Sequence, residues 1–154
     1  MKSAAKINDL QDPTAKMSKS AASNSGVIDI LDSADVNIKK IKSAVTDTGK
    51  EVVFDEKNKP GISNLLTIHS ALSGKSISDL ENEFAGKGYG DFKSAVAEVV
   101  TDFFAPVRER TQELLADETA LLQLLAVGSQ KARDVAAKTL AQTYSALGLV
   151  PPAN

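Results

Sequence analysis

The chain has 154 residues, of which 42% are hydrophobic and 25% charged, a composition typical of one soluble globular domain. It contains no cysteine and one histidine, His69, which excludes a disulfide framework, a thiolate zinc site and chemistry that needs two imidazoles. The net charge of −2 argues against a general basic surface for nucleic acid, although it leaves room for one local basic contact. No apolar run is long enough to span a membrane and no signal peptide follows Met1, so we expect a cytoplasmic protein.

The first 26 residues differ in composition from the rest of the chain. Residues 6–10 alternate enough for a short strand, but the sequence offers it no partner, so we expect residues 1–15 to form an extended arm. Residues 16–26 are rich in serine, lysine and asparagine and are expected to form a mobile loop. With no sheet or core to cover them, residues 1–26 are predicted to be the least protected part of the chain.

From residue 27 onward the apolar residues recur at helical spacing. We expect helices near residues 34–46, 60–73, 76–86, 91–115 and 118–147. Helix starts or stops are indicated by Pro60, Gly74, Asp117 and Gly148. Pro106 should kink or split the fourth helix, and Gly128 is a candidate break in the last. The apolar stripes are predicted to cover one another, which gives an all-α fold, a helical bundle with an extended N-terminal arm.

The best candidate for chemistry is the pentapeptide Lys16-Met17-Ser18-Lys19-Ser20. Two lysines three residues apart on a flexible loop make a movable double cation, and lysine is a compact charge that can follow phosphate oxygens. Such a pair would stabilise charge that develops on a leaving pyrophosphate, mostly in the transition state. On composition alone, a solvated basic linker is the other interpretation.

The letters of this pentapeptide resemble the second signature sequence of class I aminoacyl-tRNA synthetases. Other stretches are similar to bacterial tryptophanyl-tRNA synthetases, in family order: Leu10-Gln11-Asp12-Pro13-Thr14-Ala15, Ile41-Lys42-Ser43-Ala44-Val45-Thr46-Asp47, Pro60-Gly61-Ile62-Ser63-Asn64-Leu65-Leu66 and Gly86-Lys87-Gly88-Tyr89-Gly90-Asp91-Phe92-Lys93. The Gly-Lys-Gly-Tyr-Gly segment and the proline-led helix before it favour the tryptophan family over its tyrosine relative. The sequence departs from the family at Asn8, where a larger apolar residue is common, and at Ala21, which replaces a common acidic residue.

The resemblance covers essentially the whole chain and implies the C-terminal half of such an enzyme. Residues 1–26 would be the end of an incomplete Rossmann-type catalytic domain with its mobile loop, and residues 27–154 the helical domain that binds the tRNA anticodon. The tryptophan pocket would lie in the absent N-terminal half. The complete enzyme would be a homodimeric tryptophan–tRNA ligase acting on ATP, tryptophan and tRNA(Trp), whereas the isolated chain would be inactive.

The resemblance also implies roles for single residues. Lys16 and Lys19 would be catalytic, contacting the ATP phosphates and the departing pyrophosphate. The backbone of Ile7 would meet the adenine. The loop would be completed by Met17, Ser18 and Ser20. Mg²⁺ would arrive with the nucleotide, and the protein itself would hold no metal.

Some alternatives stay open on the residues alone. The chain could be a stand-alone helical module that binds RNA or a partner without catalysis. His69 is favoured as a core histidine over a ligand, the segment 86–90 as a helix-joining turn over a phosphate cradle, and Phe103-Phe104 as core over a base-stacking platform. A solvated helix face is favoured over a tRNA contact for five basic residues, Arg108, Arg110, Lys131, Arg133 and Lys138.

Overall fold

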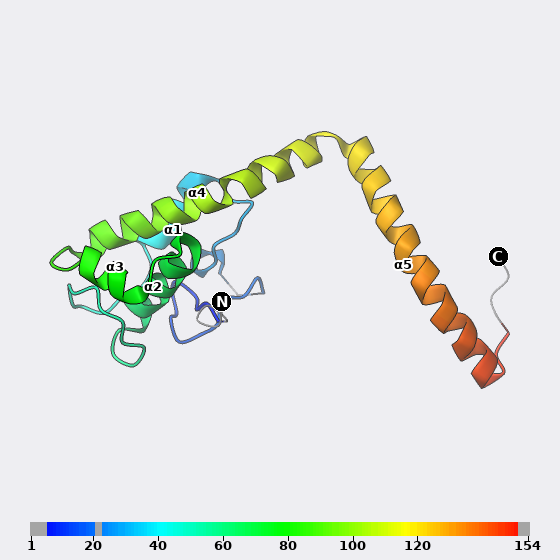
Figure 1. Cartoon of the computed structure of the whole chain (residues 1–154), viewed down its shortest axis with the longest axis horizontal. Helices are drawn as coiled ribbons and strands as arrows, with labels where there is room; N and C mark the ends of the chain where they lie inside the picture. The colour runs from blue at the N-terminus through cyan, green and yellow to red at the C-terminus, as the bar shows by residue number, and fades with distance from the viewer. Residues whose placement is uncertain (1–5, 21–22, 151–154) are drawn as a thin grey trace. The chain divides into compact units, whose positions relative to one another are not determined.

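The structure is a computed structural model that describes residues 6–20 and 23–150, so Ala21 lies outside the described residues. Within these ranges a single turn of 3-10 helix at Asn24–Gly26 precedes five α-helices, and no named strand forms (Figure 1). The helices are α1 (Ala34–Lys42), α2 (Pro60–Ser73), α3 (Ile77–Glu83), α4 (Tyr89–Ala116) and α5 (Glu118–Leu147). The predicted all-α fold class is confirmed.

Four helix ends lie where the sequence signals placed them, whereas the first helix ends at Lys42 and not near residue 46. Pro60 is the first residue of α2, and Gly74 ends that helix in the left-handed region at φ 76°. The Asp117 side chain caps α5 by accepting the backbone N–H of Ala120 at 3.0 Å, and Gly148 ends it at φ 67°. These ends are set by local backbone chemistry, which is why the sequence alone predicts them.

Neither of the two expected helix breakers ends a helix. Pro106 lies inside α4 and Gly128 inside α5, and both helices continue through them. Pro106 is exposed, so water can satisfy the carbonyl that loses its backbone partner. A single glycine costs a long helix only about 1 kcal/mol, too little to break it.

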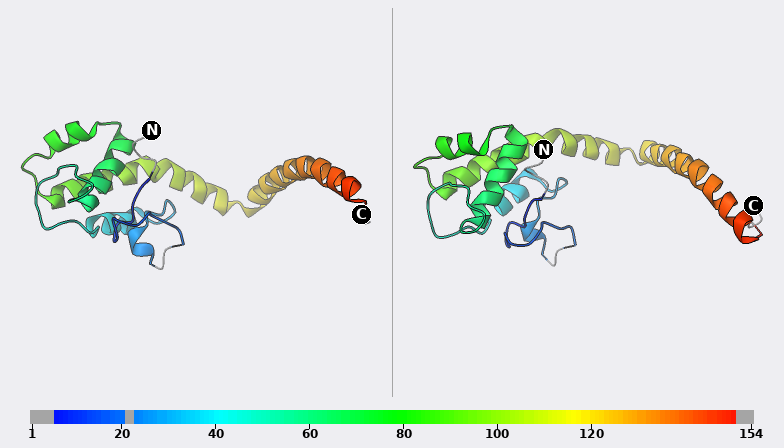
Figure 2. Two further views of the ribbon diagram at one scale, coloured as in Figure 1. Left: turned by 90° about the horizontal axis from the view of Figure 1, so that it is seen from below. Right: turned by 60° about the horizontal axis from the view of Figure 1, so that its bottom comes forward.

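The chain forms two compact units, Met1–Glu109 and Arg110–Asn154. In the first unit, α1, α2, α3 and the first half of α4 surround one apolar core (Figures 1 and 2). Its largest fully buried side chains include Phe92, Leu65 and Leu66 from the helices. Leu10, from the segment predicted to be an uncovered arm, also belongs to this core and is 2% exposed.

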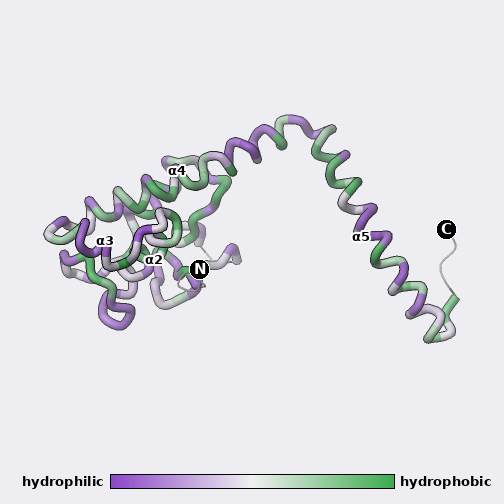
Figure 3. The backbone as a smooth tube through the Cα atoms, in the orientation of Figure 1, coloured by the Kyte–Doolittle hydropathy of each residue, from purple (hydrophilic) through white to green (hydrophobic). Residues whose placement is uncertain are grey.

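In the second unit, α5 has no buried residue. Hydrophobic and hydrophilic residues alternate along its tube in Figure 3. Leucines such as Leu124 and Leu125 are exposed. Within the described residues of its own unit, α5 therefore has no element that covers the stripe of residues 118–147, and the prediction that the other helices cover it stays a prediction. A helical apolar stripe specifies which face could be buried, but not that a partner is present.

The end of the buried stripe on α4 also differs from the prediction. Phe103 is 51% exposed, whereas its neighbour Phe104 packs against the core. The buried positions on α4 run Phe92, Val96 and Val100, so the next residue four positions on is Phe104. The interpretation of Phe103 as a core residue is wrong, and Phe104 takes that place.

Candidate functional site

The pentapeptide is carried by a hairpin of residues 7–17. Asn8 and Lys16 form an antiparallel bridge, the Asp9 N–H donates to the Ala15 carbonyl at 2.9 Å, and the Met17 N–H donates to the Ile7 carbonyl at 3.0 Å. The segment 6–10 was predicted to lack a partner, and that prediction is wrong. Its partner is the stretch immediately after it, folded back by a turn.

The turn of this hairpin is stabilised by two carboxylates. Asp12 accepts the backbone N–H of Thr14 at 3.0 Å and its hydroxyl at 2.6 Å, which lowers the pKa of the Asp12 carboxyl. Asp9 accepts the backbone N–H of Gln11 at 2.7 Å. Such aspartate turns, together with the fixed φ of Pro13, define the reversal in the stretch Leu10–Ala15.

The hairpin is bonded to the helical unit through its backbone. The Leu10 N–H donates to the Gly26 carbonyl at 2.9 Å, and the Leu10 carbonyl accepts the Val45 N–H at 2.7 Å. Gly26 is buried with the Asp9 carboxylate directly over its Cα, where a methyl group would collide. The hairpin therefore stays attached although it is not part of a sheet.

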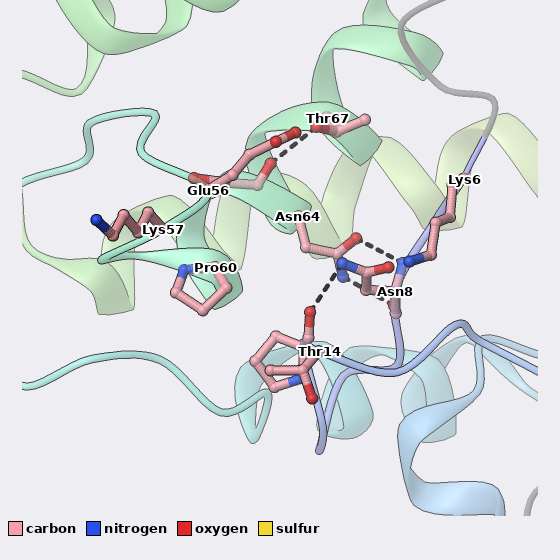
Figure 4. A pocket seen from close by; sticks show the side chains of 10 residues that line it. Lys6, Asn8, Thr14, Glu56, Lys57, Pro60, Asn64 and Thr67 are labelled. Atoms are coloured by element: carbon pink, nitrogen blue, oxygen red, sulfur yellow. Dashed lines mark hydrogen bonds between the residues drawn. The ribbon is translucent and has the colours of Figure 1, made fainter.

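Asn64 on α2 makes the longest-range tie to this hairpin. Its Oδ1 accepts the Asn8 N–H and its Nδ2 donates to the Asn8 carbonyl, each at 2.8 Å, so the side-chain amide imitates a neighbouring strand. The Asn8 side chain donates in turn to the Pro13 carbonyl at 2.8 Å. Figure 4 shows this amide pair at one wall of a polar cavity of about 540 Å³, which Lys6 and Lys57 also line.

Sequence reasoning did not single out Asn64 as a functional residue. The available signal was a polar side chain within the otherwise apolar run Ile62–Leu66, on a helix whose first turns are buried. A buried amide needs partners for its donors and its acceptor. The partner itself, 56 residues away, could not be read from the spacing.

The candidate site residues divide into two groups. Lys16, Ser18, Lys19 and Ser20 are exposed. Ile7 and Met17 are instead half-buried and pack against the core of the first unit. The loop thus presents two ammonium groups to solvent from a backbone anchored by apolar side chains, an arrangement that can meet a polyanionic ligand.

A second polar cluster joins the loop before α2 to the start of α4 in the first unit. The Tyr89 hydroxyl donates to both carboxylate oxygens of Asp47, at 2.8 and 2.9 Å, and Lys59 Nζ lies 2.9 Å from that hydroxyl and 3.3 Å from Asp47. Burial alone would raise the pKa of Asp47, but hydrogen bonds from Tyr89, the Gly49 N–H and Lys59 outweigh it and lower the pKa. The cluster ties the loop before α2 to the first residue of α4.

The remaining candidates resolve as follows. His69 is 3% exposed, its Nδ1 lies 3.1 Å from the Ser73 hydroxyl, and burial lowers its pKa, which confirms a core histidine. Gly86 has φ 76°, the backbone angle expected of a helix-joining turn. Of the basic helix residues, Arg110 pairs with Glu113 at 2.9 Å on an exposed face.

Metal and membrane features were searched over residues 6–20 and 23–150. No three histidine, aspartate or glutamate side chains there converge as metal ligands. No helix in those ranges combines the length and apolarity that a membrane span needs.

Comparison with known proteins gives consistent results. Residues 4–105 match the family model described as tRNA synthetases class I (W and Y). Tryptophan–tRNA ligase 2 of Streptomyces avermitilis is 53% identical over 151 residues, 98% of this chain and 45% of the relative. Tryptophan–tRNA ligase of Mycobacterium leprae is 50% identical over 150 residues, 97% of this chain and 44% of the relative.

Solved structures agree with the sequence relatives. Tryptophanyl-tRNA synthetase of Mycoplasma pneumoniae matches with a TM-score of 0.77 at 33% identity, over 94% of this chain and 45% of that one. The Campylobacter jejuni enzyme, solved in complex with ADP and tryptophan, matches with a TM-score of 0.68 at 32% identity, over 92% and 44%. The chain therefore spans less than half the length of the relatives it matches.

Proposed function

The chain belongs to the class I tRNA synthetases of the tryptophan and tyrosine group, and on that premise we propose that it is the C-terminal part of a tryptophan–tRNA ligase. In the complete protein, residues 1–26 end the catalytic domain and residues 27–154 form the domain that binds the tRNA anticodon. The observation that carries this proposal is the hairpin, which anchors the pentapeptide backbone and leaves Lys16 and Lys19 exposed.

The proposed chemistry of the complete enzyme is activation of tryptophan followed by its transfer to tRNA(Trp). The tryptophan carboxylate attacks the α-phosphorus of ATP, the bond from that phosphorus to the bridging oxygen breaks, and pyrophosphate leaves with the bonding electrons. The terminal hydroxyl of the tRNA then displaces AMP from the tryptophanyl adenylate.

The loop residues act on the phosphates in this scheme. The ammonium groups of Lys16 and Lys19 stabilise the charge that grows on the leaving pyrophosphate. Met17, Ser18 and Ser20 complete the loop, and the backbone of Ile7 meets the adenine. Mg²⁺ arrives with the nucleotide.

The partners of the complete enzyme follow from the same proposal. The tryptophan pocket lies in the part of the relatives that this chain does not match, and the enzyme works as a homodimer in the cytoplasm. The isolated chain should therefore give tryptophan-dependent ATP–pyrophosphate exchange at background. Exchange near the rate of a complete enzyme would contradict this division of labour.

The lysines are tested by single-turnover adenylate formation over an ATP titration in the complete enzyme. Lys16→Ala and Lys19→Ala should each slow the chemical step about a hundredfold, because each removes a charge-assisted contact made mainly in the transition state. Lysine-to-arginine variants should recover only part of the rate. The planar guanidinium group of arginine adapts less well than a compact ammonium group to phosphate oxygens that move during the reaction. Lys39→Ala, which removes an exposed lysine of α1, is the matched control.

Two outcomes would overturn these assignments. If both alanine variants raise the ATP dissociation constant a hundredfold and leave the chemical step unchanged, the lysines are ground-state anchors. If neither variant differs from the Lys39→Ala control, the loop has no part in catalysis and the roles assigned to Lys16 and Lys19 are wrong.

A further inference from the structure

An apolar cavity of about 230 Å³ lies against the inner side of the pentapeptide. Ile7 and Met17 line it from the hairpin, Ile68 and Leu72 from α2, and Phe104 from α4. Polar atoms contribute almost nothing to this lining, unlike the amide-lined cavity at Asn64. Ile28 and Ile30, from the segment between the loop and α1, complete the lining, so the cavity is a junction between the loop and the helices.

Met17 is the residue of the pentapeptide that faces inward. Its side chain is half-buried and packs against the core of the first unit, whereas its neighbours Lys16 and Ser18 are exposed. Its backbone N–H is held by the Ile7 carbonyl at 3.0 Å. Met17 is therefore fixed at two points, by a backbone hydrogen bond and by an apolar contact.

We propose that Met17 is a positioning residue whose side chain, seated between α2 and α4, sets where Lys16 and Lys19 stand. Lys16 is one residue from Met17 and Lys19 is two, and a residue spans at most about 3.6 Å. While Met17 is seated, the lysine backbones can move only a few ångströms. The function of the positioned lysines rests on the proposed function, but the seating does not.

A methionine side chain suits an apolar contact that must tolerate small movements of the loop. Its unbranched thioether has three rotatable bonds and adapts to irregular apolar space. The cavity beside Met17, which Leu72 and Phe104 also line, leaves room for the side chain to shift while it stays packed against the core. The surface of α2 and α4 thus limits the loop to a short range of positions.

Limited trypsin digestion of the full 154-residue chain tests the seating directly. Trypsin cleaves after Lys16 and Lys19, on either side of Met17, and each rate is divided by that of the same bond in a synthetic peptide carrying the same loop sequence. Met17→Ala should speed both cleavages about fivefold, because cleavage follows the population of the opened segment and half of an apolar side chain holds it closed. Met17→Leu, which keeps an apolar anchor, should stay within about twofold of the parent.

Two controls separate seating from general unfolding. Ala15→Ser changes an exposed residue of the same hairpin and should leave both rates unchanged. Cleavage after Lys93, inside α4, reports opening of the whole first unit and should not change in Met17→Ala. Leu72→Ala removes the opposite wall and should speed cleavage after Lys16 and Lys19 more than after Lys93.

The proposed packing of Met17 is wrong if Met17→Ala leaves the rates of cleavage after Lys16 and Lys19 unchanged, or if it speeds cleavage after Lys93 by the same factor. The positioning role is then measured in the complete enzyme. Met17→Ala should slow adenylate formation at least fivefold with less than a twofold change in ATP affinity, and Met17→Leu should restore the rate. If Met17→Ala loosens the loop without slowing a reaction that Lys16→Ala does slow, the positioning role is wrong. If Lys16→Ala is also without effect, the proposed function has failed and the positioning role fails with it.

Discussion

The hairpin of residues 7–17 and helix α5 show two different relations between apolar content and burial. The hairpin has few apolar residues, yet Leu10 enters the core and Ile7 and Met17 pack against it. Helix α5 is 30 residues long and rich in leucine and alanine, yet none of its residues is buried. The two regions differ in their hydrogen-bond partners. The backbone of the hairpin is hydrogen-bonded to three other segments, whereas the backbone hydrogen bonds of α5 lie within the helix.

This difference indicates that the candidate functional residues depend on the stability of the first unit and not on that of α5. Of the candidate phosphate-binding lysines, Lys16 lies on the hairpin and Lys19 lies two residues beyond its end, so their position depends on packing and hydrogen bonds in the first unit. Helix α5 is stabilised by its own backbone ladder, the Asp117 cap and the left-handed Gly148. Over the part of its own unit that the structure describes, no apolar core constrains its side chains.

The largest expected effect comes from one pair of leucines. Leu65→Ala in α2 should lower the free energy of unfolding of the first unit by about 3 kcal/mol, because Leu65 is 0% exposed and its loss leaves a cavity. Leu124→Ala in α5, where leucine is 64% exposed, should change stability by less than about 0.5 kcal/mol. Urea denaturation measures both. A loss at Leu124 equal to that at Leu65 would show that α5 is packed in solution.

The next effect tests the amide tie to the hairpin. Asn64→Ala should cost about 2 kcal/mol, since it removes two hydrogen bonds and leaves the Asn8 backbone N–H and carbonyl without protein partners. Asn64→Asp keeps an acceptor for the N–H but no donor for the carbonyl, so it should fall between the parent and the alanine variant. Equal stability of all three proteins would mean that the hairpin is held by other contacts.

Two glycines give opposite signs for the same substitution. Gly26→Ala should destabilise the first unit by about 1 to 2 kcal/mol, because the added methyl meets the Asp9 carboxylate. Gly128→Ala should stabilise α5 by up to about 1 kcal/mol, because nothing lies within 4 Å of the added methyl and alanine favours a helix. Thermal unfolding followed by helical ellipticity measures each. A stabilising Gly26→Ala would place the Asp9 turn away from Gly26.

The smallest effect concerns acid sensitivity of the first unit. Burial lowers the pKa of His69 below its ordinary 6.5, so the folded chain binds fewer protons than the unfolded chain as the pH falls through that value. Stability should be complete above pH 6.5 and decline below it, before the carboxylates titrate. In a His69→Phe variant, which keeps an aromatic ring beside Phe84 and Phe92, the decline between about pH 6.5 and 5 should vanish. An unchanged decline in the variant would assign it to other groups.

Features fixed by neighbouring residues were predictable from the sequence. Pro60, Gly74, Asp117 and Gly148 mark helix ends because each satisfies or removes a backbone hydrogen-bonding group at its own position. The pentapeptide was found for a similar reason, since its chemistry lies in five consecutive letters.

Features that depend on distant partners were not predictable. Asn64 meets Asn8 across 56 positions, and Tyr89 meets Asp47 across 42, distances over which periodicity carries no information. Both Phe103 and Phe104 fit the helical spacing of the apolar residues. Which of them is buried depends on how α4 is rotated about its axis against its neighbours, and spacing does not give that rotation. The apolar stripe of α5 identifies the face that could be buried, but it does not specify which surface would cover it.

Residue-resolved amide hydrogen exchange of the full chain tests most directly whether the lysine-bearing hairpin is built into the helical unit. The N–H groups of Leu10, Met17 and Val45, each hydrogen-bonded to or from the hairpin backbone, should exchange at least a hundredfold more slowly than that of Lys19 on the exposed loop. Asn64→Ala should abolish most of that protection while the amides of α5 keep their rates. If Leu10, Met17 and Val45 exchange as fast as Lys19 in the parent chain, the hairpin is a free arm and the anchored-loop account is wrong.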